Sequence, residues 1–180
     1  MRSELIPHPN SDAGGLTIMA EVEREGTELL LSFTVHGELG RVRLPATSPA
    51  PGRRDELWRH TCFEAFIRPA RSEAYHELNL SPSNDWAFYH FEGRRSGRSD
   101  PDLPSLTFNY KAAPNLFKLS ASIDLATLVS PAVPWQLNLT AVLEHQDGSL
   151  SYWATAHLPG APDFHHPDCF VLELTPPTAE

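Results

Sequence analysis

The chain has 180 residues, of which 41% are hydrophobic and 21% charged, a composition typical of a single folded domain spanning residues 1–180. A formal net charge of -9 opposes binding to the phosphate backbone of nucleic acids. No apolar run approaches the ~20 residues that cross a bilayer, so no membrane segment is expected. The 17 prolines limit helices and central strands, which predicts many short elements and turns.

The amino terminus and the cysteines bear on the cellular compartment. Residues 1–15 contain an arginine but no apolar stretch of the length found in secretory signals, which predicts a cytoplasmic protein. Cys62 and Cys169 are too few for a disulfide framework. We therefore expect both thiols to be reduced and buried, each beside its phenylalanine neighbour in the sequence.

Alternation of side chains with a period of two residues dominates the chain and predicts an all-β fold, an antiparallel β-sandwich of about ten strands. The alternating runs are rich in β-branched and aromatic residues and end at turn-forming residues. An Asp-Gly pair within residues 146–149 predicts a hairpin turn, and no helix longer than about three turns is expected. The expected strands are 16–23, 29–36, 62–68, 75–80, 86–92, 106–110, 116–123, 135–144, 151–158 and 169–174.

Polar and apolar side chains alternate in the strands expected at 62–68 and 75–80. Phe63 and Leu78 belong to an apolar set that must be buried on one side of the sheet if the two strands form a hairpin. Glu64, Glu77 and Asn79 then project from the other side. That side is either a solvated outer surface or a concave ligand-binding surface, and the sequence is compatible with both.

The spacing of candidate metal ligands argues against a metal site. His60 and Cys62 are close enough to share one ion, but Glu64 lies roughly 13 Å from His60 along an extended strand. Further ligands would have to come from histidines such as His157 or His165, whose spacing matches no standard zinc pattern. We expect no bound metal, with a divalent cation as the alternative.

The segment at 162–168 contains two adjacent histidines flanked by acids. Asp163 or Asp168 could orient His165 or His166 for general-base chemistry. The same pattern suits a rigid loop in which the histidines only bond to the backbone. The sequence contains no nucleophile elbow, P-loop or dinucleotide-binding motif, and it predicts no catalytic residue.

Four tryptophans could supply an aromatic surface on which the apolar face of a sugar ring stacks. Trp58 and Trp86 lie at expected strand starts next to loops, where such surfaces occur. Trp135 follows a proline and begins an apolar strand, so we expect it in the core, whereas Trp153 suits either place.

Three segments of the sequence are distinctive: ELWRHTCFEAFIRP at 56–69, YHELNLSPSNDWAFYHFEGRR at 75–95 and SYWATAHLPGAPDFHHPDCF at 151–170. Together they resemble bacterial DOMON-like proteins, which look like relatives of the family-nine carbohydrate-binding modules. The resemblance implies a β-sandwich of the jelly-roll type with a ligand-binding role, in which the ligand is a sugar or haem. The positions that match are Trp58, His60, Glu64, Glu77, Asn79, Trp86, Tyr89, Arg94, Trp153, His157 and His165. All of these except Tyr89 form the predicted ligand-binding set.

Haem is the less favoured of the two ligands. Haem-binding DOMON domains resemble b-type cytochromes with methionine and histidine as axial ligands. The methionines here are Met1 and Met19, and Met19 lies in the first expected strand, so a Met–His site does not fit. A haem held by two histidines stays as an alternative, and the prediction is that no cofactor is bound.

Three classes of function remain after these considerations. The first, which we favour, is a non-catalytic domain that binds a carbohydrate or a similar polar small molecule. The second is a small hydrolase or isomerase that uses Glu64 or Glu77 with a histidine, and the third is a haem-binding or protein-interaction module. A pocket lined by aromatic and polar groups favours the first, and a carboxylate within hydrogen-bond reach of a histidine favours the second. A flat apolar patch favours a protein partner.

Overall fold

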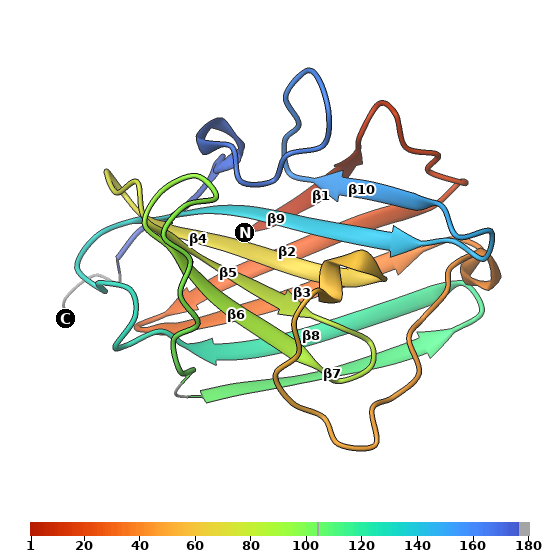
Figure 1. Cartoon of the computed structure of the whole chain (residues 1–180), viewed down its shortest axis with the longest axis horizontal. Helices are drawn as coiled ribbons and strands as arrows, with labels where there is room; N and C mark the ends of the chain where they lie inside the picture. Colours follow the sequence, from red (N-terminus) through yellow and green to blue (C-terminus); the bar gives the residue numbers. More distant parts are fainter. Residues whose placement is uncertain (104, 177–180) are drawn as a thin grey trace.

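Eleven strands form the framework of the computed structural model, which describes residues 1–103 and 105–176 (Figure 1). They are β1 (Arg2–Pro7), β2 (Thr17–Glu25), β3 (Glu28–His36), β4 (Cys62–Pro69), β5 (Tyr75–Leu80), β6 (Trp86–Phe91), β7 (Ser105–Ala113), β8 (Leu116–Asp124), β9 (Trp135–Glu144), β10 (Leu150–Ala154) and β11 (Leu172–Leu174). The helical elements in this part of the chain are three short 3₁₀ helices, η1 (Leu39–Arg41), η2 (Leu57–Arg59) and η3 (Pro167–Cys169). The expected all-β fold without long helices is confirmed.

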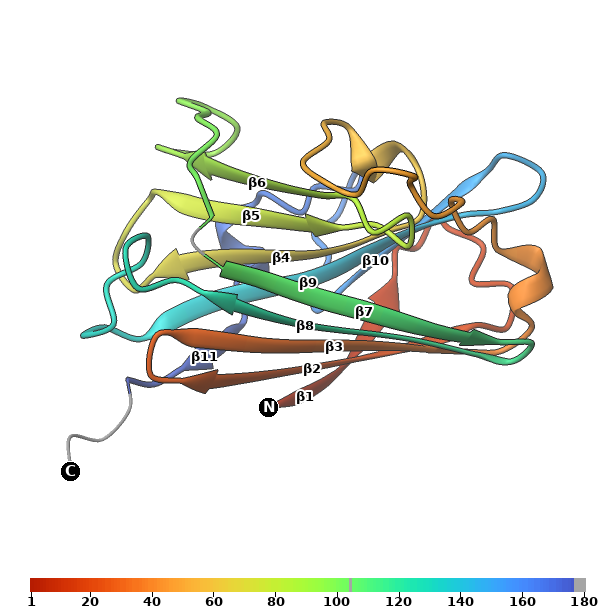
Figure 2. The ribbon, with the colours of Figure 1, turned by 90° about the horizontal axis from the view of Figure 1, so that it is seen from below.

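The strands form one ladder that folds over into two packed layers. Their order is β6-β5-β4-β9-β10-β1-β2-β3-β8-β7, and β11 pairs with the part of β9 that β10 does not reach. Figure 2 shows β6, β5 and β4 in a layer above β8, β3 and β2. We call β6, β5, β4, β9 and β10 the pocket layer, and β2, β3, β8 and β7 the opposite layer. The expected antiparallel β-sandwich is therefore present.

Strand β1 belongs to both layers. Residues 2–5 pair with β2 of the opposite layer, whereas Ile6 and Pro7 pair with β10 of the pocket layer. The sequence analysis did not predict this strand, because Leu5 is its only buried residue and no alternation is visible in so short a run. Its double pairing connects the two layers at one edge of the sandwich.

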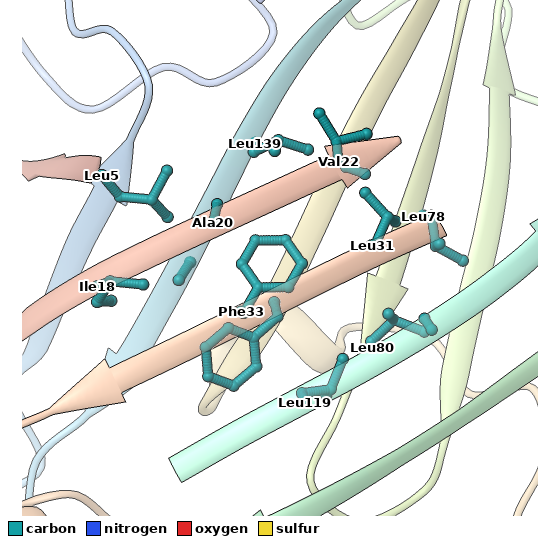
Figure 3. Packing of buried hydrophobic residues seen from close by; sticks show 14 of the residues in the cluster. Leu5, Ile18, Ala20, Val22, Leu31, Phe33, Leu78, Leu80, Leu119 and Leu139 are labelled. Atoms are coloured by element: carbon teal, nitrogen blue, oxygen red, sulfur yellow. The ribbon is translucent and has the colours of Figure 1, made fainter. Parts of the chain in front are cut away.

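The hydrophobic core fills the space between the layers. Figure 3 shows Phe33 of β3 within a cluster that also contains Leu78 and Leu80 of β5, from the other layer. The ring of Phe63 stacks on Phe117 at 5.1 Å between ring centroids and lies against Phe33 at 5.4 Å. These aromatic contacts join β4 to β8 and β3, so the centre of the core holds the two layers together.

Two tryptophans are fully buried in this core. Trp135 is 0% exposed, as expected, and its indole Nε1 donates to the carbonyl of Ser130 at 2.8 Å. Trp153 is 1% exposed, and its Nε1 donates to the hydroxyl of Ser151 at 3.0 Å. Because each indole N–H has a partner inside the protein, both rings are buried without an unsatisfied donor.

The last two expected strands are shorter in the structure. β10 ends at Ala154 rather than at residue 158, and β11 begins at Leu172, while Cys169 belongs to η3. The prolines at 159, 162 and 167 lack a backbone N–H, so residues between the two strands cannot continue a ladder.

The hairpin expected at 146–149 is present. The backbone N–H of His145 donates to the carbonyl of Ser149 at 2.8 Å, and Gly148 has a φ of 85°.

The helices of the two described ranges include none long and apolar enough to cross a membrane.

Both cysteines are buried and free, in agreement with the sequence analysis. The thiol of Cys62 lies 3.6 Å from Asn79 Oδ1, whereas Phe63 turns into the core, because neighbours on a strand project to opposite faces. The expected side-chain contact with the neighbouring phenylalanine is therefore replaced at Cys62 by a contact with an amide. Burial raises the pKa of both thiols, Cys62 more than Cys169.

We predict that neither thiol reacts quickly in the native protein, because burial blocks access and disfavours the thiolate. A thiol reagent that gives a coloured product should label both cysteines at once in guanidinium chloride but slowly in buffer. Rapid labelling of Cys62 under native conditions would contradict the placement of β4 described above.

Candidate functional site

A pocket of about 500 Å³ lies on the outer face of the pocket layer, the side turned away from the core. We call it the outer-face pocket. Its floor consists of strand residues Glu64, Phe66, Glu77, Tyr89, Phe91, Val142 and Tyr152. Its wall consists of Trp58, Arg95, Arg98, Pro162, Phe164 and His165. The volume is within the range of small-molecule sites in proteins.

The wall comes from three segments that extend over the pocket layer. Trp58 belongs to η2, directly before β4, and Arg95 and Arg98 belong to the connection between β6 and β7. Phe164 and His165 precede η3. Figure 2 shows the first two of these segments rising above β5 and β6. They turn the outer face of the sheet into a partly enclosed pocket.

Strand pairing brings the two glutamates together on the floor. In the register of β4 and β5, Glu64 faces Asn79 and Phe66 faces Glu77, so the carboxyl groups are diagonal neighbours on one face. The alternate residues Phe63 and Leu78 enter the core. The shared face of Glu64, Glu77 and Asn79 is the arrangement that the sequence analysis expected.

Both carboxyl groups are buried, so a solvated outer surface is the wrong interpretation of this face. Glu64 is 2% exposed and Glu77 is 5% exposed. Glu64 Oε2 accepts a hydrogen bond from Thr140 Oγ1 at 2.8 Å, and Glu77 Oε1 accepts one from Asn79 Nδ2 at 2.7 Å. Glu64 Oε1 is buried and has no hydrogen-bond partner in the protein. Such an orphaned oxygen is costly unless a ligand or water satisfies it.

Burial changes the protonation of this pair. Burial, followed by repulsion from Glu77, raises the pKa of Glu64 to about 8. Burial also raises the pKa of Glu77 to about 7, although the Asn79 amide and the charge of Arg95 act in the other direction. Near neutral pH Glu64 is therefore largely protonated and Glu77 partly so, and a protonated carboxyl group can donate as well as accept hydrogen bonds.

His165 connects the wall to the floor. Its Nδ1 lies 2.7 Å from the hydroxyl of Tyr75, which accepts a hydrogen bond from the backbone N–H of Arg95 at 3.2 Å. Burial, and then the charge of Arg95, lowers the pKa of His165 to about 4, so the ring is neutral near pH 7. If the Tyr75 hydroxyl donates to Nδ1, the ring proton is on Nε2, which lies 3.7 Å from Glu77 Oε2.

Asp163 holds the arginine side of the wall in place. Arg95 pairs with Asp163 at 3.1 Å, and Arg94 forms a second ion pair with the same carboxylate. Asp163 Oδ1 also accepts the backbone N–H of His165 at 3.2 Å. The β6–β7 connection is thus tied to the segment that carries His165.

The second arginine of the wall also has acidic partners. Arg98 pairs with Asp55 at 3.0 Å and with Asp100 at 3.1 Å. Its guanidinium lies 4.0 Å from the centroid of the Tyr89 ring, whose hydroxyl donates to Asp55 at 2.8 Å. Arg98 therefore fixes Tyr89 through a cation–π contact and a shared carboxylate.

The structure brings four residues of the predicted ligand-binding set to the outer-face pocket: Trp58, Glu64, Glu77 and His165. Trp58 is 45% exposed at the rim, which leaves part of its ring free to contact a ligand. Asn79 is buried on the same face without lining the pocket, and its amide donates to Glu77. A binding role for these residues stays a prediction.

The other predicted residues lie elsewhere. Trp86 lines a separate hollow of about 590 Å³ near β7, and Trp153 is in the core. His60 is exposed and pairs with Glu144 at 2.8 Å, while Arg94 pairs with Asp163 outside the pocket lining. His157 Nε2 donates to the carbonyl of residue 6 at 2.8 Å, away from the pocket. None of these five lines the outer-face pocket, and a binding role for them stays a prediction.

Several pocket residues were not predicted. Phe91 has the outer-face parity of Tyr89, so alternation along the strand 86–91 was a usable signal for it, whereas both faces of the strand 150–154 mix polar and apolar residues and did not single out Tyr152. Tyr89 was matched only through the resemblance. Arg95 and Arg98 lie in a connection whose path depends on tertiary contacts with Asp163 and Asp55, and no local pattern indicates it.

Within residues 1–103 and 105–176, no three His, Cys, Asp or Glu side chains come together in a way that could hold a metal ion. The outer-face pocket can therefore bind through hydrogen bonds, aromatic contacts and charge.

Comparisons with known proteins bear on the fold. No protein-family model and no curated protein sequence matches the chain. A candidate carbohydrate-binding protein from Bacteroides uniformis matches over 94% of this chain and 83% of its own, with a TM-score of 0.70 and 16% identity. A family 9 carbohydrate-binding module from Caldicellulosiruptor kristjanssonii, solved with cellotriose, matches over 88% and 75%, with a TM-score of 0.52 and 13% identity. The likeness shows a shared fold.

Proposed function

We propose that this chain is a non-catalytic domain that binds a carbohydrate or a similar polar small molecule in the outer-face pocket. The observation that carries this proposal is Glu64 Oε1, a buried oxygen without a partner in a pocket lined by aromatic rings. A hydroxyl group of a ligand would supply the missing hydrogen bond. The fold shared with a module solved in complex with cellotriose supports the proposal.

The lining suits a sugar ring in two ways. Protonated Glu64 and Glu77 can each donate to one hydroxyl and accept from another, and Glu77 is already fixed by Asn79. Trp58, half exposed at the rim, presents an apolar ring face of the kind on which a sugar stacks. Because the floor is built on paired strands, its polar groups are positioned before the ligand arrives.

A hydrolase or isomerase that uses Glu77 with His165 is the second candidate. The raised pKa of Glu77 favours it, because general acids and bases work best near the ambient pH. Against it, His165 Nε2 lies 3.7 Å from Glu77 Oε2, beyond hydrogen-bond reach, and Nδ1 is occupied by Tyr75. Binding is therefore the function that the geometry supports better.

We also propose two properties of this chain that rest on its sequence alone. One is the relationship to DOMON-like proteins within the carbohydrate-binding-module fold. The other is a cytoplasmic location. A sequence survey for homologues with the 56–69 and 162–170 segments, and fractionation of the native source, would test them.

We predict that Trp58→Ala weakens sugar binding by about tenfold or more, because it removes an aromatic face at the rim. The melting temperature should stay nearly unchanged, since the side chain is 45% exposed. Calorimetric titration with neutral and amino monosaccharides and with β-linked oligosaccharides measures the affinity. Trp86→Ala, in the separate hollow, is the matched control and should bind as the wild type does. If no sugar in the panel binds the wild-type protein, the proposal is wrong.

A further inference from the structure

We propose that the outer-face pocket selects a ligand that carries a positively charged ammonium group, of which an amino sugar is the form that fits the proposed function. The ammonium would lie against Glu64 and Glu77, with the rest of the ligand toward Trp58. This inference rests on the proposed function, because it names the class of ligand for the same pocket.

The floor contains two acidic groups without a cationic partner. Among the described residues, the one basic group within 4 Å of Glu77 is His165, and its ring is neutral near pH 7. Glu64 has no ion pair there, and its Oε1 has no hydrogen bond. Buried acids in proteins are almost always paired with a cation or a set of donors. The missing partner points to a positive charge that the ligand brings.

The arginines of the wall do not fill this role. Arg95 is paired with Asp163, and Arg98 with Asp55 and Asp100, so each guanidinium already has an acidic partner outside the floor. Both are about half exposed to water, which weakens their effect on the buried glutamates. The two carboxyl groups at the buried end of the pocket therefore have no charged cationic partner among the described residues.

The remaining lining favours an organic cation over a metal ion. Phe66, Phe91 and Phe164 line the pocket, and the faces of such rings attract ammonium groups. No cluster of three metal-ligating side chains exists in the described residues. A pocket of about 500 Å³ also has room for the body of a monosaccharide around the charged group.

Binding of a cation would be coupled to proton release. Burial keeps the protons on Glu64 and Glu77, and a neighbouring positive charge favours their loss. The other titratable or charged groups around the pair are Cys62, Tyr75, Tyr89, Arg95, Arg98 and His165. Of these, the cysteine and the two tyrosines have raised pKa values and stay neutral near pH 7, so the two glutamates are the source of the proton.

The test is calorimetric titration of the full chain at pH 6.5 with matched pairs of sugars. Glucosamine is compared with glucose, galactosamine with galactose, and chitosan oligomers with cello-oligosaccharides, each in two buffers that differ in ionisation enthalpy. We expect at least one amino sugar to bind about tenfold or more tightly than its neutral counterpart. The buffer dependence should show release of protons on binding.

Isosteric variants locate the effect. Glu64→Gln and Glu77→Gln keep the shape of the floor and should each reduce the preference for the amino sugar severalfold, whereas the exposed Glu23→Gln should keep it. If neutral sugars bind as tightly as amino sugars, or no proton is released, the inference fails while the proposed function stands. If neither set binds, both fail.

Discussion

At pH 8, the Glu64→Gln variant should unfold at a temperature about 6–12 °C higher than the wild-type protein, because it removes a buried acid that resists ionisation. The expected gain in the free energy of unfolding is on the order of 3 kcal/mol. The amide oxygen of the variant would keep the hydrogen bond that Glu64 Oε2 accepts from Thr140, so the packing of the floor should not change. At pH 4.5 the two proteins should be about equally stable.

The pH window follows from the raised pKa of Glu64. In the unfolded chain this carboxyl loses its proton near pH 4.5, whereas in the folded protein it keeps it up to about pH 8. Below pH 4.5 both states are protonated, and the folded state bears no penalty. As the pH rises from there, folding retains a proton that the unfolded chain gives up, so wild-type stability falls by up to about 1.4 kcal/mol per pH unit. Glu77 adds to this loss up to about pH 7.

Thermal unfolding followed by circular dichroism between pH 4.5 and 9 measures this effect. The control is Glu23→Gln, an exposed site on β2, which should leave the whole curve in place. A wild-type stability that does not fall between pH 5 and pH 8 would mean that the carboxyl groups ionise freely, and the buried floor would then be wrong.

Phe63→Ala should lower the free energy of unfolding by about 4 kcal/mol, which corresponds to a fall of about 8–16 °C in melting temperature. Phe63 is fully buried, and its ring contacts Phe117 of β8 and Phe33 of β3 across the sandwich. Its removal leaves a cavity where the two layers meet, and strands paired on both edges cannot move in to fill it.

Phe108→Ala removes the same atoms from β7, the strand at one end of the ladder, where the side chain is only half-buried. Its cost in chemical denaturation should be less than half that of Phe63→Ala, because less area returns to water and water can enter the space. Equal losses for the two variants would contradict the placement of Phe63 at the centre of the core.

The part of the site that lies on strands could be predicted because its signal is local. Phe63 and Leu78 alternate with Glu64 and Glu77, and burial of the apolar pair fixes the direction of the acids whatever the rest of the fold does. The general all-β class follows from the same alternation, repeated along the chain. Only the partner strands, and hence the order of the ladder, depend on contacts between distant segments.

The remaining features depend on tertiary contacts or on weak local patterns. Trp153 alternates with Tyr152, and both faces of that strand mix polar and apolar residues, so parity did not show which ring enters the core. His157 follows the end of β10 and was therefore assigned to a strand that does not reach it. The path of the β6–β7 connection is set by Asp163, which lies 68 residues from Arg95.

The two faces of β4 have separate tasks, and this separation bears on how the domain can diversify. Residues 63, 65 and 67 belong to the core, while 64 and 66 line the outer-face pocket. A descendant could exchange the residues at 64 and 66, and those at 77 and 89 on the neighbouring strands, without disturbing a single position between the layers. New ligand preferences can therefore arise by substitution at every second residue, on a scaffold that stays the same.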